Sequence, residues 1–350
     1  MKRHIMKGRG ATLTIEGRFE SRTREAFEDG WASEPLPPFR TTVTVEKAKS
    51  VIQHQDSPDL PFSQSLNAYR GCEHGCIYCY ARPSHAYLGL SPGLDFETKL
   101  FAKPDASELL RHELGRKNYR CEVLALGTNT DPYQPIEREW KITRNVLALL
   151  EETSHPVSIV TKSALIERDI DLLSELAGKN LVQVHISVTT LNPELARKME
   201  PRASSPARRL EAMKRLNEAK IPCGVLAAPI IPFLTDSELE AILCEARKAG
   251  AGSAGYALLR LPHELKALFS DWLKTHYPMK ADHVMNRLRQ MREGRENDPE
   301  YGARMRGKGI FADLLEQRFA LAAKKLGFND GPVFLDKTLF RPPGRQMNLF

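Results

Sequence analysis

Three of the six cysteines lie within eight residues of one another, close enough in the chain to bind one metal centre together. They are Cys72, Cys76 and Cys79, in the stretch RGCEHGCIYCYARPSHAY (residues 70–87). A tight loop with the spacing CxxxCxxC brings all three sulfur atoms to one side, where they can bind a soft metal. Zinc would need a fourth protein ligand, for which His74 and His85 are candidates. An iron–sulfur cluster would instead leave one iron without a cysteine and open to another ligand.

The composition is that of an ordinary globular protein of 350 residues, with 41% hydrophobic and 27% charged residues. No uncharged apolar run approaches the roughly 18 residues that a bilayer crossing needs, and the first residues lack the apolar segment of a secretory signal. We therefore expect a cytoplasmic protein without a membrane partner, in which the cysteine cluster is a metal site rather than a disulfide framework. The other cysteines are isolated in the sequence and are predicted to be buried thiols: Cys121, Cys223 and Cys244.

The chain is basic, with a formal net charge of +7 and a pI of about 9.0. A positive surface favours polyanionic partners such as nucleic acids. Candidate phosphate contacts near the carboxyl terminus are Arg287, Arg289, Arg292, Arg304, Arg306 and Lys308. The alternative is that these side chains pair on a solvated surface with Glu293, Glu296, Asp298 and Glu300.

Short apolar runs alternate with amphipathic segments of helical period over most of the chain. The runs are residues 63–71, 121–128, 156–163, 181–190, 221–231 and 252–261. This alternation of six strands with helices predicts an α/β fold with a parallel sheet, either open or closed toward a barrel. Ligands of such sheets bind beyond the carboxyl ends of the strands, and the cysteine cluster directly follows the first run.

The alternation also predicts the domain organisation. Residues 1–60 lack the pattern and are expected to form an amino-terminal extension, with a proline-rich stretch at residues 32–40. Residues 61–275 form the predicted catalytic core. Residues 276–350 are predicted to be a small helical appendage, with helices in residues 281–294 and 311–327.

The three cysteines, with the aromatic Tyr78 before the last, resemble the CxxxCxΦC signature of the radical S-adenosylmethionine (SAM) enzymes. The resemblance implies a partial (β/α)6 TIM-type barrel and a [4Fe-4S] cluster whose open iron binds SAM. It also implies reductive cleavage of SAM to a 5'-deoxyadenosyl radical, with electrons from a donor such as flavodoxin or ferredoxin. Tyr78 is then expected to lie against the cofactor.

Three further loops resemble the branch of this superfamily that contains spore photoproduct lyase. The tail, with YGARMRGKGIFADL (residues 301–314), also resembles an uncharacterised subgroup of that branch. The loop LALGTNTDPYQPIE (residues 124–137) resembles the branch's Ser/Thr-Asp turn, which implies that Thr130 and Asp131 contact the SAM amino group. The strand ends IVTKS and HISVTT imply that Lys162 and Ser187 hold the SAM carboxylate or ribose. The ordinary alternatives are an Asx turn at Asp131 and a solvated strand end at Lys162.

A turn containing Glu-Pro, in the segment MEPRASSPARRL, also resembles this branch. There Arg202 is a candidate contact to SAM or substrate, and Ser204 or Ser205 is a candidate helix cap. One position departs from the branch, because Thr128 stands where the lyases carry a hydrogen-donating cysteine. A hydroxyl O–H bond is much harder to cleave homolytically than a thiol S–H bond, so Thr128 does not inherit that role.

The resemblance thus predicts an enzyme, with lyase-type repair or modification of DNA as one candidate reaction. Branch and charge favour a nucleic-acid substrate, and a protein or a small metabolite is the alternative. A different class of function is a zinc-stabilised nucleic-acid-binding module. Metal content and SAM cleavage separate that module from the enzyme.

Overall fold

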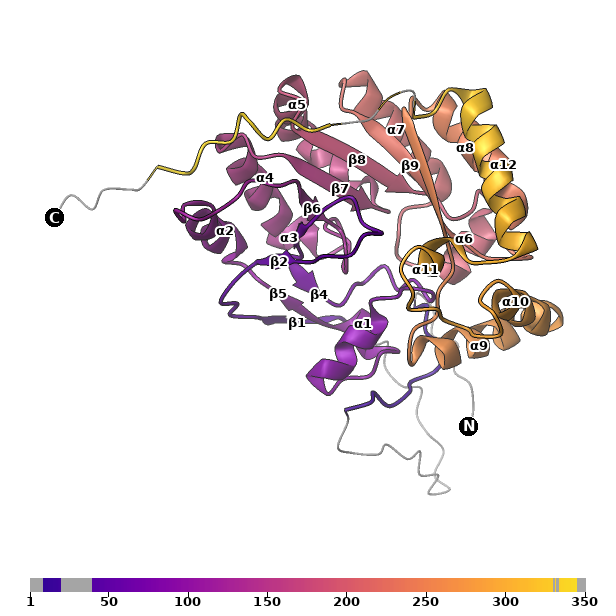
Figure 1. Cartoon of the computed structure of the whole chain (residues 1–350). Coiled ribbons are helices and arrows are strands. Elements are labelled where there is room, and N and C mark those ends of the chain that lie inside the picture. Colours follow the sequence, from indigo (N-terminus) through magenta and orange to yellow (C-terminus); the bar gives the residue numbers. More distant parts are fainter. Residues whose placement is uncertain (1–8, 20–39, 330, 332–333, 345–350) are drawn as a thin grey trace.

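A seven-stranded sheet forms the centre of the molecule, as the computed structural model shows for residues 9–19, 40–329, 331 and 334–344 (Figure 1). Its parallel strands follow one another in chain order: β3 (Gln64–Leu66), β6 (Leu124–Leu126), β7 (Val157–Thr161), β8 (Val182–Ser187), β9 (Cys223–Ile230) and β10 (Ser253–Leu258). A short strand, β2 (Ile52–His54), pairs antiparallel with β3 at one edge. Within the described residues the two edge strands do not pair with each other. The six predicted strands are confirmed, and they form an open, partial (β/α)6 barrel.

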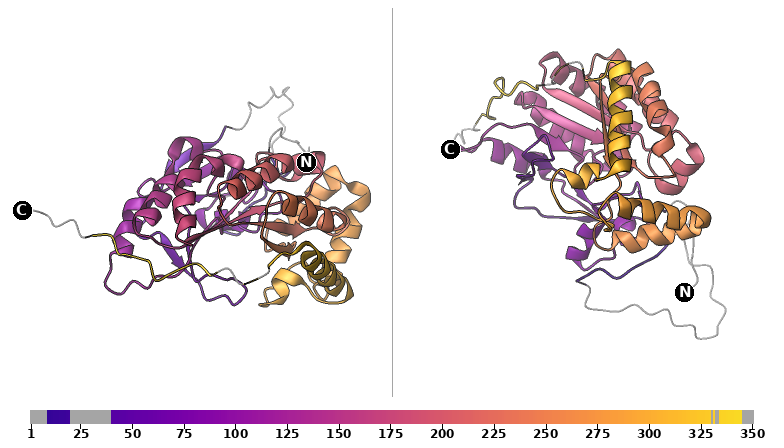
Figure 2. Two further views of the ribbon diagram at one scale, coloured as in Figure 1. Left: turned by 90° about the horizontal axis from the view of Figure 1, so that it is seen from above. Right: turned by 45° about the vertical axis from the view of Figure 1, so that its right-hand side comes forward.

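Helices connect successive strands and cover the outer face of the sheet (Figures 1 and 2). They are α2 (Ala106–Leu114), α3 (Glu137–Trp140), α4 (Ile142–Glu152), α5 (Ile170–Gly178), α6 (Pro193–Met199), α7 (Pro206–Glu218) and α8 (Leu239–Lys248). The hydrophobic effect holds the helices against the sheet, because apolar side chains on one face of each strand are buried when they pack against the helices. In β8, Val182, Val184 and Ile186 are fully buried, while the alternate residues Gln183 and His185 are partly exposed on the other face.

The amino-terminal residues contribute strands to both sheets of the molecule. β1 (Thr42–Val45) runs parallel to β5 (Lys99–Ala102), which also pairs with β4 (Tyr69–Arg70) in a small second sheet. The proline-rich residues 32–39 lie outside the described residues. The division of the chain at residues 60 and 275 stays a prediction.

The carboxyl-terminal residues add helices beside the last strands and a tail across the sheet. The helices are α9 (Leu265–His276), α10 (Pro278–Gln290), α11 (Ala303–Arg306) and α12 (Ile310–Leu326), so both helices expected after residue 276 are present. Helix α12 packs on α8, where Arg318 forms a 2.6 Å ion pair with Glu240. The tail then crosses the amino ends of the strands, where the amide of Asp336 donates to the Asn180 carbonyl over 3.0 Å (Figure 1). Of the helices in the described ranges, none has both the length and the apolarity that a membrane crossing requires.

The backbone turn after β6 is closely packed against the neighbouring strand at the carboxyl edge of the sheet. Gly127 has a φ of +90°, and a Cβ atom there would lie 2.0 Å from the Val160 carbonyl oxygen. We expect Gly127→Ala to lower the free energy of unfolding by more than about 2 kcal/mol, because the strand β7 must shift to admit the methyl group. Denaturant unfolding measures this change.

Gly178 provides the matched control, because it ends α5 with no atom within 4 Å of an added Cβ. Gly178→Ala is expected to leave the stability unchanged or to raise it by up to about 1 kcal/mol. Equal effects of the two substitutions would contradict the close approach at Gly127.

Candidate cluster and cofactor site

The three predicted metal ligands lie together in the cysteine loop (residues 71–81), which follows β4. Cys72 and Cys76 are buried, Cys79 is partly buried, and all three thiols are free. Burial raises the pKa of each thiol, and Asp131 raises the pKa of Cys72 further. Three thiolates therefore cost much free energy here unless a cation compensates them. Three soft donors in one loop, two of them buried, fit a metal centre, which deprotonates its cysteine ligands.

A buried ion pair between Arg82 and Glu97 holds the backbone of the cysteine loop in place. Arg82 begins the 3-10 helix η1 (Arg82–Leu88), and its Nη2 atom lies 2.5 Å from Oε1 of Glu97 in α1 (Asp95–Thr98). Both side chains are fully buried. The same guanidinium donates to the carbonyl oxygens of Gly75 and Cys76, over 3.0 and 2.8 Å. Arg82 thus ties the backbone of the loop to a fixed carboxylate.

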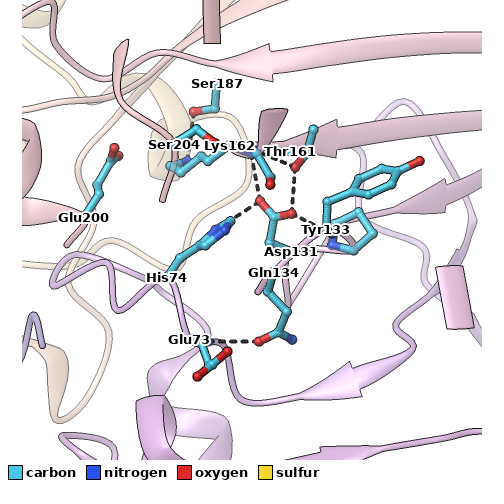
Figure 3. A network of polar contacts seen from close by, with 12 residues as sticks. Glu73, His74, Asp131, Tyr133, Gln134, Thr161, Lys162, Ser187, Glu200 and Ser204 are labelled. Atoms are coloured by element: carbon cyan, nitrogen blue, oxygen red, sulfur yellow. Dashed lines mark hydrogen bonds and ion pairs between the residues drawn. The ribbon is translucent and has the colours of Figure 1, made fainter. Parts of the chain in front are cut away.

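The loop after β6 clamps the cysteine loop from a second side (Figure 3). Gln134 is fully buried, and its Oε1 atom accepts from the Glu73 amide over 2.9 Å while its Nε2 atom donates to the Gly71 carbonyl over 3.2 Å. Beside it, His74 Nδ1 lies 3.3 Å from the carboxylate of Asp131. The loops after the first two parallel strands are therefore joined at the cysteines.

Asp131 also joins both loops to strand β7 (Figure 3). Its carboxylate accepts from the Thr161 hydroxyl over 2.6 Å and from the backbone amides of Lys162 and Tyr133 over 2.7 and 2.9 Å. Burial by itself would raise the pKa of Asp131, but His74 and the hydrogen bonds from Thr161 and Lys162 lower it to about 2. The group is therefore a carboxylate at neutral pH, with both oxygen atoms engaged.

Lys162 and Ser187 end adjacent strands, and the structure brings them together. The Lys162 ammonium donates to the Ser187 hydroxyl over 2.8 Å and lies 5.8 Å from the centre of the Tyr78 ring. Burial lowers the pKa of Lys162, while Cys76 and Asp131 act to raise it. Three of the five residues predicted to bind SAM, Tyr78, Lys162 and Ser187, thus lie in contact with one another, with Lys162 partly buried between the other two.

A buried pair that the sequence did not single out supports this group from behind. Glu200 forms an ion pair with Arg209, and both side chains are 1% exposed. The Glu200 carboxylate also accepts from the hydroxyls of Tyr78 and Thr189. Arg209 donates to the Ser187 carbonyl over 3.0 Å. Glu200 lies in the quoted Glu-Pro turn, but its nine-residue separation from Arg209 follows no helical or strand period, so only the fold reveals the pair.

Other predicted residues have different surroundings. The Thr130 hydroxyl donates to the Tyr69 carbonyl over 3.2 Å, and its role in binding SAM stays a prediction. Arg202 lies 3.1 Å from Glu73 in the cysteine loop. Ser205, rather than Ser204, caps helix α7 by accepting from the Arg208 amide. Of the three isolated cysteines, only Cys223 is buried, while Cys121 and Cys244 are partly exposed because they lie at the edges of the core.

The two histidines considered as zinc ligands each have one ring nitrogen engaged elsewhere. His74 pairs with Asp131, and His85 Nε2 lies 2.9 Å from the Lys99 carbonyl oxygen. In the part of the chain that the structure describes, no three His, Cys, Asp or Glu side chains are arranged around a single-ion site. The geometry of the cysteines alone therefore assigns no particular metal.

Sequence comparison identifies the relatives of this chain. The family described as the radical SAM superfamily matches residues 66–244. An uncharacterised protein of Mycobacterium tuberculosis (strain H37Rv) is 38% identical over 250 residues, which cover 71% of this chain and 72% of that protein. An uncharacterised protein of Methanocaldococcus jannaschii is 30% identical over 193 residues, which cover 55% of this chain and 69% of that protein.

Structure comparison finds the same fold in spore photoproduct lyase. The lyase in complex with dinucleoside spore photoproduct has a TM-score of 0.58 at 14% identity, with 82% of this chain and 80% of the lyase covered. A variant of the lyase with bound SAM and the same dinucleoside has a TM-score of 0.53 at 15% identity, with the same coverage. At this level of identity the comparison shows a shared fold.

The buried pair under the cysteine loop yields a test that does not need a bound cofactor. We expect Arg82→Met to lower the free energy of unfolding by about 3 to 5 kcal/mol, because the Glu97 carboxylate is left buried without its cation. The double variant Arg82→Met, Glu97→Gln should recover part of that loss. Denaturant unfolding of the two single variants and the double variant measures the coupling.

Arg111→Met is the matched control, because Arg111 pairs with Glu152 where both side chains are about half exposed. Such surface pairs contribute at most about 1 kcal/mol. Additive effects of the Arg82 and Glu97 substitutions would show that the two side chains do not depend on each other.

Proposed function

Because the chain belongs to the radical SAM superfamily, we propose that Cys72, Cys76 and Cys79 hold the [4Fe-4S] cluster of an enzyme that acts on nucleic acid. The presence of three free thiols in one loop, two of them buried and one partly buried, is the observation that supports these ligands. When bound, the family's cluster and SAM supply a 5'-deoxyadenosyl radical that abstracts hydrogen from a substrate. The protein provides position and exclusion of water.

The side chains around Lys162 are suited to orient SAM. An ammonium held between the Ser187 hydroxyl and the Tyr78 ring presents a fixed positive charge, which complements a carboxylate. Asp131 holds the backbone amide of Lys162 and the ring of His74, so it positions the lysine relative to the cysteine loop. We propose Lys162 and Ser187 as contacts of the SAM carboxylate or ribose. We propose that Asp131 and Thr130 contact the SAM amino group and that Tyr78 packs against the cofactor.

A nucleic-acid substrate is supported by two observations. The chain carries a net charge of +7, and its fold is that of a lyase whose structure holds a dinucleoside lesion. A donor protein such as flavodoxin or ferredoxin is the proposed source of electrons, because enzymes of this family need a reductant.

The hydrogen-transfer step is expected to differ from that of the lyases. The Thr128 hydroxyl is hydrogen-bonded to Asn67, at a distance of 2.9 Å from the Asn67 nitrogen, and offers no thiol hydrogen. The Tyr80 hydroxyl donates to the Thr128 carbonyl oxygen. Tyr80 is therefore the proposed hydrogen relay, and the reaction is proposed as a repair or modification other than that of the spore photoproduct.

Anaerobic reconstitution tests the proposed enzyme directly. We expect four irons and four sulfides per chain in the wild type, together with reductive cleavage of SAM. An alanine at Cys72, Cys76 or Cys79 should abolish both, because three thiolates are required to hold the cluster. Iron and sulfide analysis and detection of 5'-deoxyadenosine are the measurements.

Alanine substitutions at Cys121, Cys223 and Cys244 are the matched controls, and these variants should retain the cluster. Stoichiometric zinc without iron in the wild type would overturn the proposal in favour of a zinc-stabilised module.

Binding of SAM tests the proposed orienting residues separately. Lys162→Ala and Ser187→Ala should each weaken SAM binding about ten- to hundredfold, because a hydrogen bond to a charged group contributes about 1.5 to 3 kcal/mol. Equilibrium dialysis against the reconstituted protein measures the affinity, and the cluster absorbance should stay unchanged. Lys214→Ala is the control, because Lys214 is exposed on α7. Wild-type affinity in both test variants would remove these residues from the SAM site.

A further inference from the structure

An arginine without a carboxylate partner lies beside the cysteine loop. Arg260 follows β10 by two residues, and its guanidinium carbon is 4.5 Å from the centre of the Tyr80 ring, next to Cys79. Within the described residues its guanidinium forms no hydrogen bond or ion pair, although the side chain is half-buried. An arginine that is half-buried and unpaired in this way costs free energy, which an anionic ligand would recover.

Neighbouring arginines make the surroundings of Arg260 more positive. Arg292 is 1% exposed, and its Nη2 atom donates to the Leu259 carbonyl over 2.7 Å and to the Arg304 carbonyl over 3.2 Å. Among the residues that the structure describes, its Nε and Nη1 atoms have no hydrogen-bond partner. Burial lowers the pKa of Arg292 to about 10, and the charge of Arg260 contributes to this shift. Arg292 therefore holds the backbone at both arginines while adding charge to the site.

Three of the six basic residues predicted from the sequence to contact phosphate pair with carboxylates: Arg289, Arg304 and Lys308. Lys308 lies 3.1 Å from Glu293 and 2.8 Å from Glu300, and Arg289 pairs with Glu296. Arg304 is bonded to Asp59 and Ser57. Lys308 is thus paired as in the alternative, whereas Arg304 pairs with Asp59, outside the expected set, where its side chain is 17% exposed. Within the described residues Arg287, Arg292 and Arg306 also form no ion pair, but Arg287 and Arg306 lie over the rings of Phe311 and Tyr256, and Arg292 is buried. Arg260, which the sequence analysis did not single out, is the half-buried arginine without an ion pair beside the cysteine loop.

Exposed tyrosines lie beside these arginines. Tyr80 is 43% exposed and Tyr301 is 58% exposed. The Arg304 guanidinium carbon lies 4.8 Å from the centre of the Tyr301 ring. Proteins that bind single-stranded nucleic acid combine guanidinium groups with exposed aromatic rings, because phosphates pair with the former and bases stack on the latter. A small carboxylate ligand would pair with the arginine but would not stack on the aromatic rings.

We infer that Arg260 binds a backbone phosphate of an unpaired nucleic-acid strand, whose bases stack on Tyr80 and Tyr301 at the carboxyl edge of the sheet. This inference rests on the proposed function, because it deepens the nucleic-acid substrate to a strand with unstacked bases. The phosphate contact positions a nucleotide beside the cysteine loop, where the radical is generated.

Oligonucleotide binding by the reconstituted full chain tests this site without relying on turnover. The probe is a fluorescent oligothymidylate of about 12 nucleotides, within the span that such binding sites cover. Arg260→Gln should weaken binding about tenfold and flatten the slope of log affinity against log salt by about 0.7, because one phosphate contact is lost. Arg260→Lys should restore the slope, and Tyr301→Ala should lower the affinity while keeping the slope.

The control variant is Arg111→Gln on α2, which should retain both affinity and slope. An unchanged slope in Arg260→Gln would overturn the phosphate contact while leaving the nucleic-acid substrate in place. Equal binding of duplex and single strand, with no effect of Tyr301→Ala, would overturn the stacking. If the wild type binds no oligonucleotide although it cleaves SAM, the nucleic-acid substrate and this inference both fail, and the radical SAM chemistry stands.

Discussion

The ion pair between Arg82 and Glu97 fixes the loop on which the rest of the site depends. The carboxylate also accepts from the backbone amides of Gly10 and Ala11, over 3.0 and 2.9 Å, so one buried acid joins the amino-terminal residues to the cysteine loop. Burying two charges costs desolvation energy, which good geometry and additional hydrogen bonds offset. The value of the pair therefore lies in specifying one loop conformation. A loop that must present three thiols to one centre needs such rigidity.

The open barrel lets several loops reach the same place. The carboxyl ends of parallel strands lie along one edge, so the loops after β3, β6, β7 and β8 contact one another without long connections. Asp131 bonds to residues of two of these neighbours, and Lys162 bonds to a third. The cysteine loop and the proposed SAM contacts are therefore joined by one polar network.

Two regions of this edge differ in how their charged side chains are paired. The region around Lys162 is the proposed SAM site, and the region near β10 is the proposed substrate site. Around Lys162 the charged groups Asp131 and Glu200 are paired with His74 and Arg209, and the ammonium is bonded to Ser187, which suits a cofactor that must be held in one orientation. Toward β10 the charges are less balanced, with Arg260 unpaired and aromatic rings exposed. An incompletely paired surface is suited to a ligand that enters and leaves. Cofactor and substrate would thus meet where the two regions join, at Tyr80 and Cys79.

Local pattern was sufficient to predict the six strands, the major helices and the cysteine loop. Short apolar runs that alternate with amphipathic segments indicate which residues are buried in strands. The contact between Lys162 and Ser187 follows from their places at the ends of adjacent parallel strands. The pairs Arg82 with Glu97 and Glu200 with Arg209 have no such pattern, because tertiary packing decides which buried charge meets which. The same holds for the basic residues from 287 onward. The sequence shows that they are present, but the fold decides which of them meet a carboxylate. Only the fold shows that Lys308 and Arg304 are neutralised, while Arg260 is left without a carboxylate beside Tyr80.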